Sequence, residues 1–284
     1  MIDAALASVD DYVAYLNGAE IPALRVTQRG LDSALQRIDR VTRHDLSAVL
    51  LRDPLMTVKV LAYIQPMHGK SLRGDISTVG SAIMMLGIEP FFRRFAELPL
   101  VEQRLADQPA VLLCVLKTIQ RAQRAAEFAR DWAIWRHDLN AEEVTIAALL
   151  HDIAELLLWT FAPKLMLEIH RLQQANSQLR SVVAQKAVLG ITTQELQLAL
   201  CQVWQLPELL RLLMDDTKAD HPRVRNVSLA VDLARHLAQG GWENAAIADD
   251  IKAIGTLLNL NEAATRERLG MPPEAAETDA TTAP

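Results

Sequence analysis

Residues 141–158 read AEEVTIAALLHDIAELLL, an apolar stretch that is interrupted by one adjacent histidine and aspartate, His151 and Asp152. Neighbouring side chains on a helix diverge by about 100°, so both can reach a metal ion beside the helix when other helices supply further ligands. The alternative is a core helix with a hydrogen-bonded histidine and a capping or surface aspartate. The stretch therefore predicts a buried helix and a candidate metal site that depends on partners elsewhere in the chain.

Two further His-Asp pairs, His44-Asp45 and His137-Asp138, lie among polar residues just before apolar periodic stretches. Aspartate at such a position accepts hydrogen bonds from the free N–H groups of a helix start. We interpret Asp45 and Asp138 as N-cap or first-turn acids. Only His151-Asp152 has apolar flanks on both sides.

The composition favours helices and argues against a nucleic-acid partner. Of the 284 residues, 50% are hydrophobic and only 5% aromatic, and leucine and alanine dominate. The net charge of -6 and the pI of about 5.7 disfavour a protein that neutralises phosphates with a basic face. The two cysteines, Cys114 and Cys201, lie far apart and form no CxxC motif, so the sequence indicates neither a zinc ribbon nor a disulfide framework. This cysteine usage is typical of a protein in a reducing compartment.

The N-terminus, MIDAALASVDDYVAYL, carries acids where a signal peptide needs basic residues. No uninterrupted apolar run reaches about 18 residues. We therefore expect a cytoplasmic protein that does not contact the membrane.

Apolar residues recur at helical spacing along most of the chain, and no long stretch alternates with period two. Prolines at starts and joins support the division into helices. The predicted helices span residues 30–40, 45–64, 75–88, 110–132, 141–159, 163–175, 178–188, 192–204 and 223–239.

Three further segments accompany the central stretch in a fixed order. They are HDLSAVLLRDPLMTVKVLAYI (44–64) with Asp53-Pro54, ISTVGSAIMMLGIEPF (76–91) with Gly87, and LCQVWQLPELL (200–210) with Trp204 and Pro207. Together with ALLHDIA, the four motifs resemble those of HDOD, the HD-related output domain of bacterial signalling proteins in the HD superfamily. The resemblance covers roughly residues 20 to 215.

The resemblance and the helical pattern together imply an all-α fold of two packed helical lobes, the second of them HD-domain-like. We expect an N-terminal lobe over residues 1–100, an HD-like lobe over 101–240 and a helical extension over 241–270. Residues 271–284, rich in proline, alanine, threonine and acids, cannot bury a core and are expected to be disordered.

An active HD phosphohydrolase adds a histidine on an upstream helix and a later aspartate to the HD pair, and its metals activate water. Aligning the alanines of VLKTIQRAQRAAEFA with the family pattern places Lys117 at the first position, and no histidine occurs between His68 and His137. Aligning AVDLARHLA places Arg235 at the second position. A shift of one turn would instead nominate Asp232 or His236.

We therefore expect a vestigial HD site made of His151, Asp152, Lys117 and Arg235. A lysine or arginine at a ligand position keeps Asp152 ionised without metal but offers no open coordination site. We expect no cofactor; if the site were active, His151 and Asp152 would hold a divalent metal. The alternative is that both cations point to solvent.

The expected function is that of a non-catalytic HDOD module that binds a protein partner, or a small ligand, in a signalling pathway. One alternative is a metal-dependent phosphohydrolase acting on a nucleotide second messenger. Another is a sensor that binds a nucleotide without cleaving it, with phosphate contacts from Arg121 and Arg124 in addition to Lys117 and Arg235. The segment RLLMDDTKADHPRVR (211–225) is either a partner surface or, as we favour, a solvated joint. The sequence does not indicate an oligomeric state.

Overall fold

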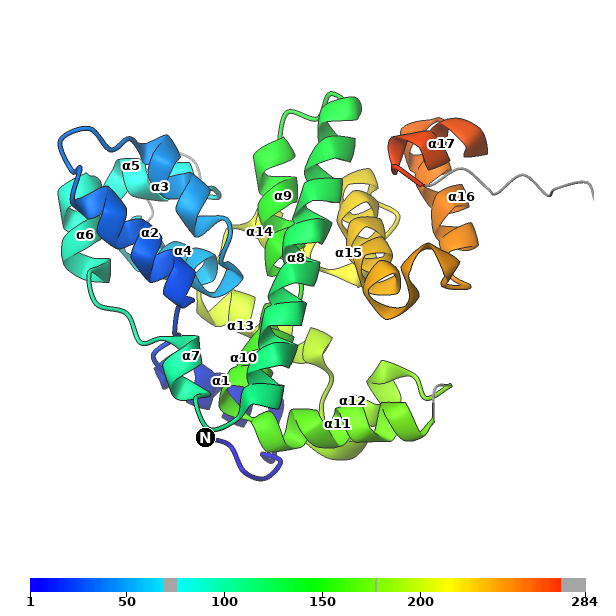
Figure 1. Ribbon diagram of the computed structural model, residues 1–284, viewed down its shortest axis with the longest axis horizontal. Helices are drawn as coiled ribbons and strands as arrows, with labels where there is room; N and C mark the ends of the chain where they lie inside the picture. Colours follow the sequence, from blue (N-terminus) through cyan, green and yellow to red (C-terminus); the bar gives the residue numbers. More distant parts are fainter. Residues whose placement is uncertain (69–75, 177, 272–284) are drawn as a thin grey trace, which may run out of the picture.

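The computed structural model describes residues 1–68, 76–176 and 178–271, and all regular secondary structure in these ranges is helical. This confirms the predicted all-α fold in two packed lobes (Figure 1). One continuous cluster of buried apolar side chains draws on both lobes, so they share a core. The last 13 residues of the predicted disordered tail, 272–284, lie outside the described residues.

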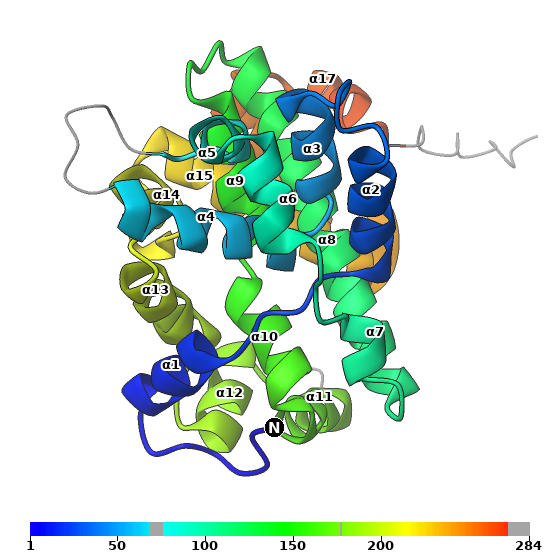
Figure 2. The same ribbon diagram turned by 90° about the vertical axis from the view of Figure 1, so that its left-hand side faces the viewer.

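The N-terminal lobe faces the viewer in Figure 2. It consists of α2 (Arg25–Leu35), α3 (Arg43–Leu50), α4 (Pro54–His68), α5 (Val79–Leu86) and α6 (Ile88–Phe95). The short helix α7 (Val101–Arg104) leads to the second lobe. That lobe contains α8 (Pro109–Trp135), α9 (Ala141–Leu150), α10 (Ile153–Phe161), α11 (Pro163–Ala175), α12 (Ser181–Leu189), α13 (Thr193–Val203), α14 (Glu208–Leu213) and α15 (Pro222–Gly240).

The long helix α8 is the central helix of the second lobe, with α9 on one side and α15 on the other (Figure 1). Small side chains let helices approach closely, and five alanines of α8 are buried: Ala122, Ala125, Ala126, Ala129 and Ala133. The alanine pattern of residues 115–129 thus lies on the packing face of α8.

Two predicted helices differ from the observed ones because of Asp53. The predicted helix over 45–64 is two helices, α3 and α4, and the predicted helix over 30–40 is α2, which begins at Arg25. Asp53 is fully buried between α3 and α4, and its carboxylate accepts hydrogen bonds from the amides of Leu24 (2.8 Å) and Met56 (3.1 Å). It also accepts one from the hydroxyl of Thr27 (2.8 Å). One side chain therefore fixes the starts of both α2 and α4. Its bond to Met56 is a local N-cap beside Pro54, whereas its bonds to Leu24 and Thr27 are tertiary and are not encoded in the local sequence.

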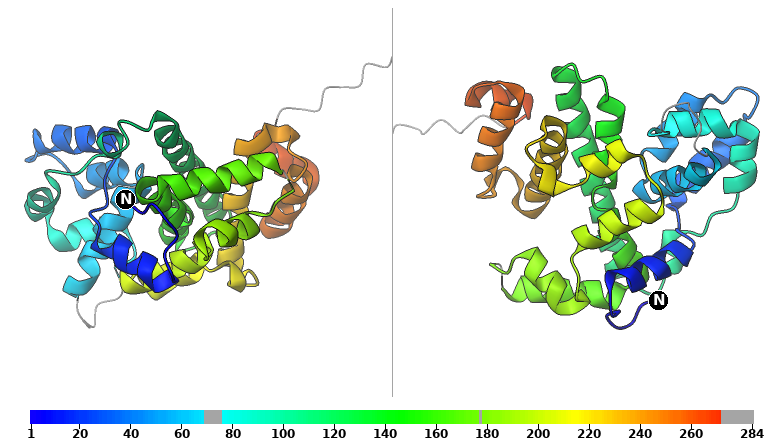
Figure 3. Two further views of the ribbon diagram at one scale, coloured as in Figure 1. Left: turned by 90° about the horizontal axis from the view of Figure 1, so that it is seen from below. Right: turned by 180° about the vertical axis from the view of Figure 1, so that it is seen from behind.

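The first helix, α1 (Val9–Gly18), packs against α13 of the second lobe (Figure 3). The Tyr12 hydroxyl donates to the carbonyl of Leu189 (3.2 Å), and the amide of Ile2 donates to the carbonyl of Phe161 (2.7 Å). In space, the N-terminus therefore lies with the HD-like lobe, whereas the sequence groups residues 1–100 with the other lobe.

Two helices extend the second lobe beyond α15: α16 (Ile247–Leu258) and α17 (Glu262–Arg268). They lie on the side of α15 away from the N-terminal lobe (Figure 1). His236 on α15 pairs with Asp250 on α16 (2.7 Å), and Arg268 on α17 pairs with Asp131 on α8 (2.9 Å).

The stretch Ala141–Phe161 is long and apolar enough to cross a membrane, although charged residues interrupt it. Within the protein, 83% of its most apolar window is buried. It is the core of the second lobe, as the central sequence predicted, and not an exposed apolar helix.

Candidate functional site

The HD pair lies at a break between α9 and α10, where the sequence predicts a single helix over 141–159. In a continuous helix the amide of Ala154 would donate to the carbonyl of Leu150. The side chain of Gln197, from α13, is inserted between them: its Oε1 accepts from Ala154 (3.0 Å) and its Nε2 donates to Leu150 (2.9 Å). This insertion ends α9 and turns His151 and Asp152 toward the neighbouring helices.

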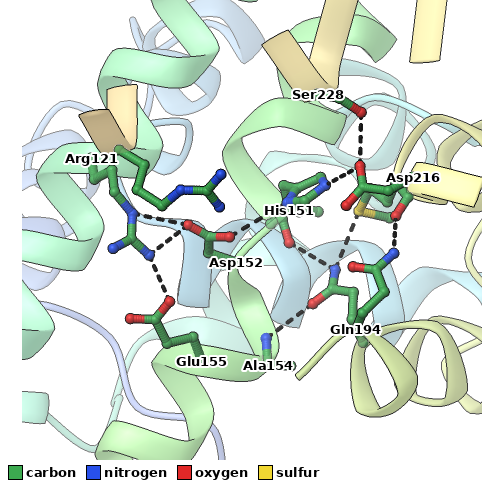
Figure 4. A network of polar contacts seen from close by, with 12 residues as sticks. Arg121, His151, Asp152, Ala154, Glu155, Gln194, Asp216 and Ser228 are labelled. Atoms are coloured by element: carbon green, nitrogen blue, oxygen red, sulfur yellow. Dashed lines mark hydrogen bonds and ion pairs between the residues drawn. The ribbon is translucent and has the colours of Figure 1, made fainter. Parts of the chain in front are cut away.

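The guanidinium of Arg121, from α8, forms an ion pair with the Asp152 carboxylate (Figure 4). Its Nε and Nη2 both donate to Oδ2 of Asp152, at 3.0 and 2.6 Å, and Nη2 also donates to Glu155 at 2.6 Å. Burial alone would raise the pKa of Asp152, but Arg121 and His151 outweigh burial and hold it well below its usual value. Asp152 is therefore an ionised carboxylate that is neutralised by a guanidinium.

His151 is held between two carboxylates. Its Nδ1 lies 3.4 Å from Oδ1 of Asp152 and its Nε2 lies 3.1 Å from Oδ1 of Asp216, which also accepts from Ser228 of α15 at 2.7 Å. Burial lowers the pKa of His151, but hydrogen bonds and charges of the two aspartates overcome it and raise the pKa to about 10. At neutral pH the ring is an imidazolium that donates from both nitrogens.

This arrangement does not fit a metal centre. A metal-binding histidine must be neutral and present a free lone pair, whereas both nitrogens of His151 face carboxylates as donors. Arg121 takes the Asp152 oxygen that would face a cation. Across the described ranges 1–68, 76–176 and 178–271, no three His, Cys, Asp or Glu side chains are grouped as metal ligands.

The cation beside Asp152 is Arg121 and not the predicted Lys117 or Arg235. Lys117 is exposed one helical turn earlier on α8, four residues before Arg121. Arg235 pairs with Asp232 on its own helix. Arg124, the other candidate for anion contacts, is exposed with its guanidinium 5.5 Å from the centre of the Phe128 ring.

Of the two other His-Asp pairs, the first behaves as predicted: Asp45 forms a capping box with Thr42 at the start of α3. Asp138 accepts from the amide of Asn140 just before α9 and also pairs with Arg223 of α15. That second contact joins helices distant in sequence.

Three residues of the site were not singled out from the sequence: Gln197, Glu155 and Ser228. For Gln197 a signal exists, since it lies on the apolar face of α13 between Leu196 and Leu200 at helical spacing. Asp216 lies in the segment 211–225, for which the sequence favours a solvated joint. It is instead the second carboxylate on His151.

The charge state of the site predicts a pH dependence of stability. The pKa of His151 is raised in the folded protein, so its contribution is complete below about pH 6.5 and is lost as pH rises through about 10. The free energy of unfolding should fall toward alkaline pH with a slope of up to about 1.4 kcal/mol per pH unit from this one proton. Urea unfolding of the wild type and of His151→Gln across this range measures it. Parallel losses in both proteins would contradict it.

Comparison with known proteins agrees with this architecture. The family model of the HDOD domain matches residues 21–219, more than half of the chain. The chain belongs to the HDOD family. The match confirms the resemblance read from the four motifs, and α15, α16 and α17 lie beyond the matched HDOD residues.

Solved structures of similar fold include the following two proteins. The MmoQ response regulator of Methylococcus capsulatus has a TM-score of 0.61 and 18% identity, over 84% of this chain and 98% of that one. A virulence factor of Campylobacter jejuni has a TM-score of 0.64 and 16% identity, over 95% and 94%. No curated protein sequence gives a significant match.

Proposed function

We propose that this HDOD protein is a non-catalytic module of a signalling pathway that acts by binding a protein partner in the cytoplasm. The family supports a signalling role, and the solved structure of similar fold from Methylococcus capsulatus is described as a response regulator. The single observation that supports the absence of catalysis is the ion pair in which Nε and Nη2 of Arg121 both donate to Asp152. A side-chain cation stabilises the carboxylate but neither offers an open coordination position nor lowers the pKa of a bound water.

The nucleotide-sensor alternative has less support from the same geometry. Arg121, the candidate phosphate contact nearest the HD pair, has its donors directed at Asp152 and Glu155. A phosphate would have to displace two carboxylates that already neutralise the guanidinium. The described contacts therefore favour an internal role for Arg121 over an anion-binding one.

Hydrolysis of bis(p-nitrophenyl) phosphate in the presence of Mn²⁺, Fe²⁺, Mg²⁺ or Zn²⁺ tests the proposed absence of catalysis. We expect the wild type to give the same rate as Asp152→Asn, because no metal-activated water forms. Metal-dependent turnover in the wild type that Asp152→Asn abolishes would refute the proposal. Lys117→Ala serves as a matched control, since Lys117 is exposed and contacts neither member of the HD pair.

A further inference from the structure

A cavity of about 360 Å³ lies where the α8–α9 connection meets the start of α15, lined by residues 136–139 and 221–223. The α8–α9 connection forms the upper end of the molecule in Figure 1. None of the lining residues takes part in the network around His151. The cavity is therefore a feature separate from the HD pair.

The cavity lining holds two guanidinium groups, those of Arg136 and Arg223, and one carboxylate, that of Asp138, whose pKa both arginines lower. Arg223 pairs with Asp138 at 2.8 Å, so these two charges offset each other. Arg136 donates only to the carbonyl of Pro222, at 3.3 Å, and among the residues that the structure describes it forms no ion pair. This corner is thus locally cationic in a chain whose net charge is -6.

Apolar side chains are exposed beside this cation. Leu139, which lines the cavity, is 97% exposed. Outside the lining, Ile134 and Trp135 at the end of α8 are 58% and 45% exposed, and Nε1 of Trp135 donates to the carbonyl of Leu258 in α16. The guanidinium of Arg268 lies 4.2 Å from the centre of the Trp135 ring, which holds that ring in place. Covering such side chains with an apolar partner is favourable in proportion to the area removed from water.

We propose that this corner binds an acidic and apolar peptide segment of a partner protein. A carboxylate of the segment would pair with Arg136, and an apolar side chain would cover Leu139. The inference rests on the proposed function and gives the chemistry of the partner that the module binds. Charge complementarity favours this occupant over a second copy of the chain, because a two-fold contact would bring the Arg136 side chains of both copies to one interface.

Fluorescence anisotropy with a short fluorescein-labelled peptide of alternating glutamate and leucine tests the proposal. We expect saturable binding that Arg136→Glu weakens at least about tenfold and that added salt weakens as well. Leu139→Ser should weaken it several-fold without disturbing the fold, since this side chain makes almost no contact within the protein. Arg93→Glu, a charge reversal at an exposed arginine of α6, should leave binding unchanged.

The absence of saturable binding, or equal effects of Arg136→Glu and Arg93→Glu, would overturn the proposal. A dimer in sedimentation that Arg136→Glu dissociates would also overturn it, because the occupant would then be a second copy. Melting temperatures equal to that of the wild type establish that the variants are folded. These variants leave the HD pair intact. A failure of peptide binding would therefore reject only the proposed peptide site. Metal-dependent hydrolysis would instead reject the proposed non-catalytic function.

Discussion

Arg121→Met should lower the free energy of unfolding by about 3 to 5 kcal/mol, the usual cost of removing one partner from a buried ion pair. The Arg121 and Asp152 side chains are 17% and 19% exposed, so water screens their interaction only weakly. Methionine keeps the apolar stem and removes the charge, which leaves Asp152 and Glu155 without their shared cation. Urea unfolding monitored by circular dichroism gives the loss directly.

A double-mutant cycle separates this ion pair from general packing. Asp152→Asn should recover part of the stability lost in Arg121→Met, because it removes the unpaired carboxylate. Lys117→Met, one turn earlier and exposed, should leave the unfolding midpoint unchanged. If the losses of stability in Arg121→Met and Asp152→Asn were additive, or if Lys117→Met lost as much stability as Arg121→Met, the ion pair of Arg121 with Asp152 would not stabilise the site.

Asp53→Ala should cost about 3 kcal/mol or more, because three buried donors lose their acceptor at once. These donors are the amides of Leu24 and Met56 and the hydroxyl of Thr27. Asp53→Asn should cost less but remain clearly destabilising, since the amide nitrogen cannot accept. Thermal unfolding of both variants measures the difference.

The matched control for Asp53 is Asp39→Ala, an exposed acid in the turn that follows α2. Its melting temperature should equal that of the wild type. If Asp53→Ala were as stable as Asp39→Ala, the buried carboxylate would not be what joins the starts of α2 and α4.

The fold could be predicted well from the sequence where helical periodicity is strong. The predicted helix over 163–175 matches α11 at both ends, and that over 110–132 lies within α8. The two missed breaks have different causes. Asp53-Pro54 starts α4 locally, since Asp53 accepts from the amide of Met56 three residues later, whereas Gln197 divides the segment 141–159 by hydrogen bonds to residues remote in sequence.

The candidate site could be predicted only in part. The sequence identified His151-Asp152 as the pair with apolar flanks and led to the expectation of a cation in place of a metal ligand. It did not determine which cation, because an alanine-rich helix aligns almost equally well after a shift of one turn. Lys117 and Arg121 differ by that shift, and only the rotation of α8 against α10 places Arg121 on Asp152.

The metal content of the purified protein tests the central claim most directly, namely that His151 and Asp152 are neutralised by side chains and not by a metal. After incubation with Mn²⁺, Fe²⁺ or Zn²⁺ and removal of excess ion, mass spectrometry should find far less than one equivalent per chain. His151→Ala should have the same content. One full equivalent of metal in the wild type that is lost in His151→Ala would contradict this claim. It would instead support a metal-dependent hydrolase site at His151 and Asp152.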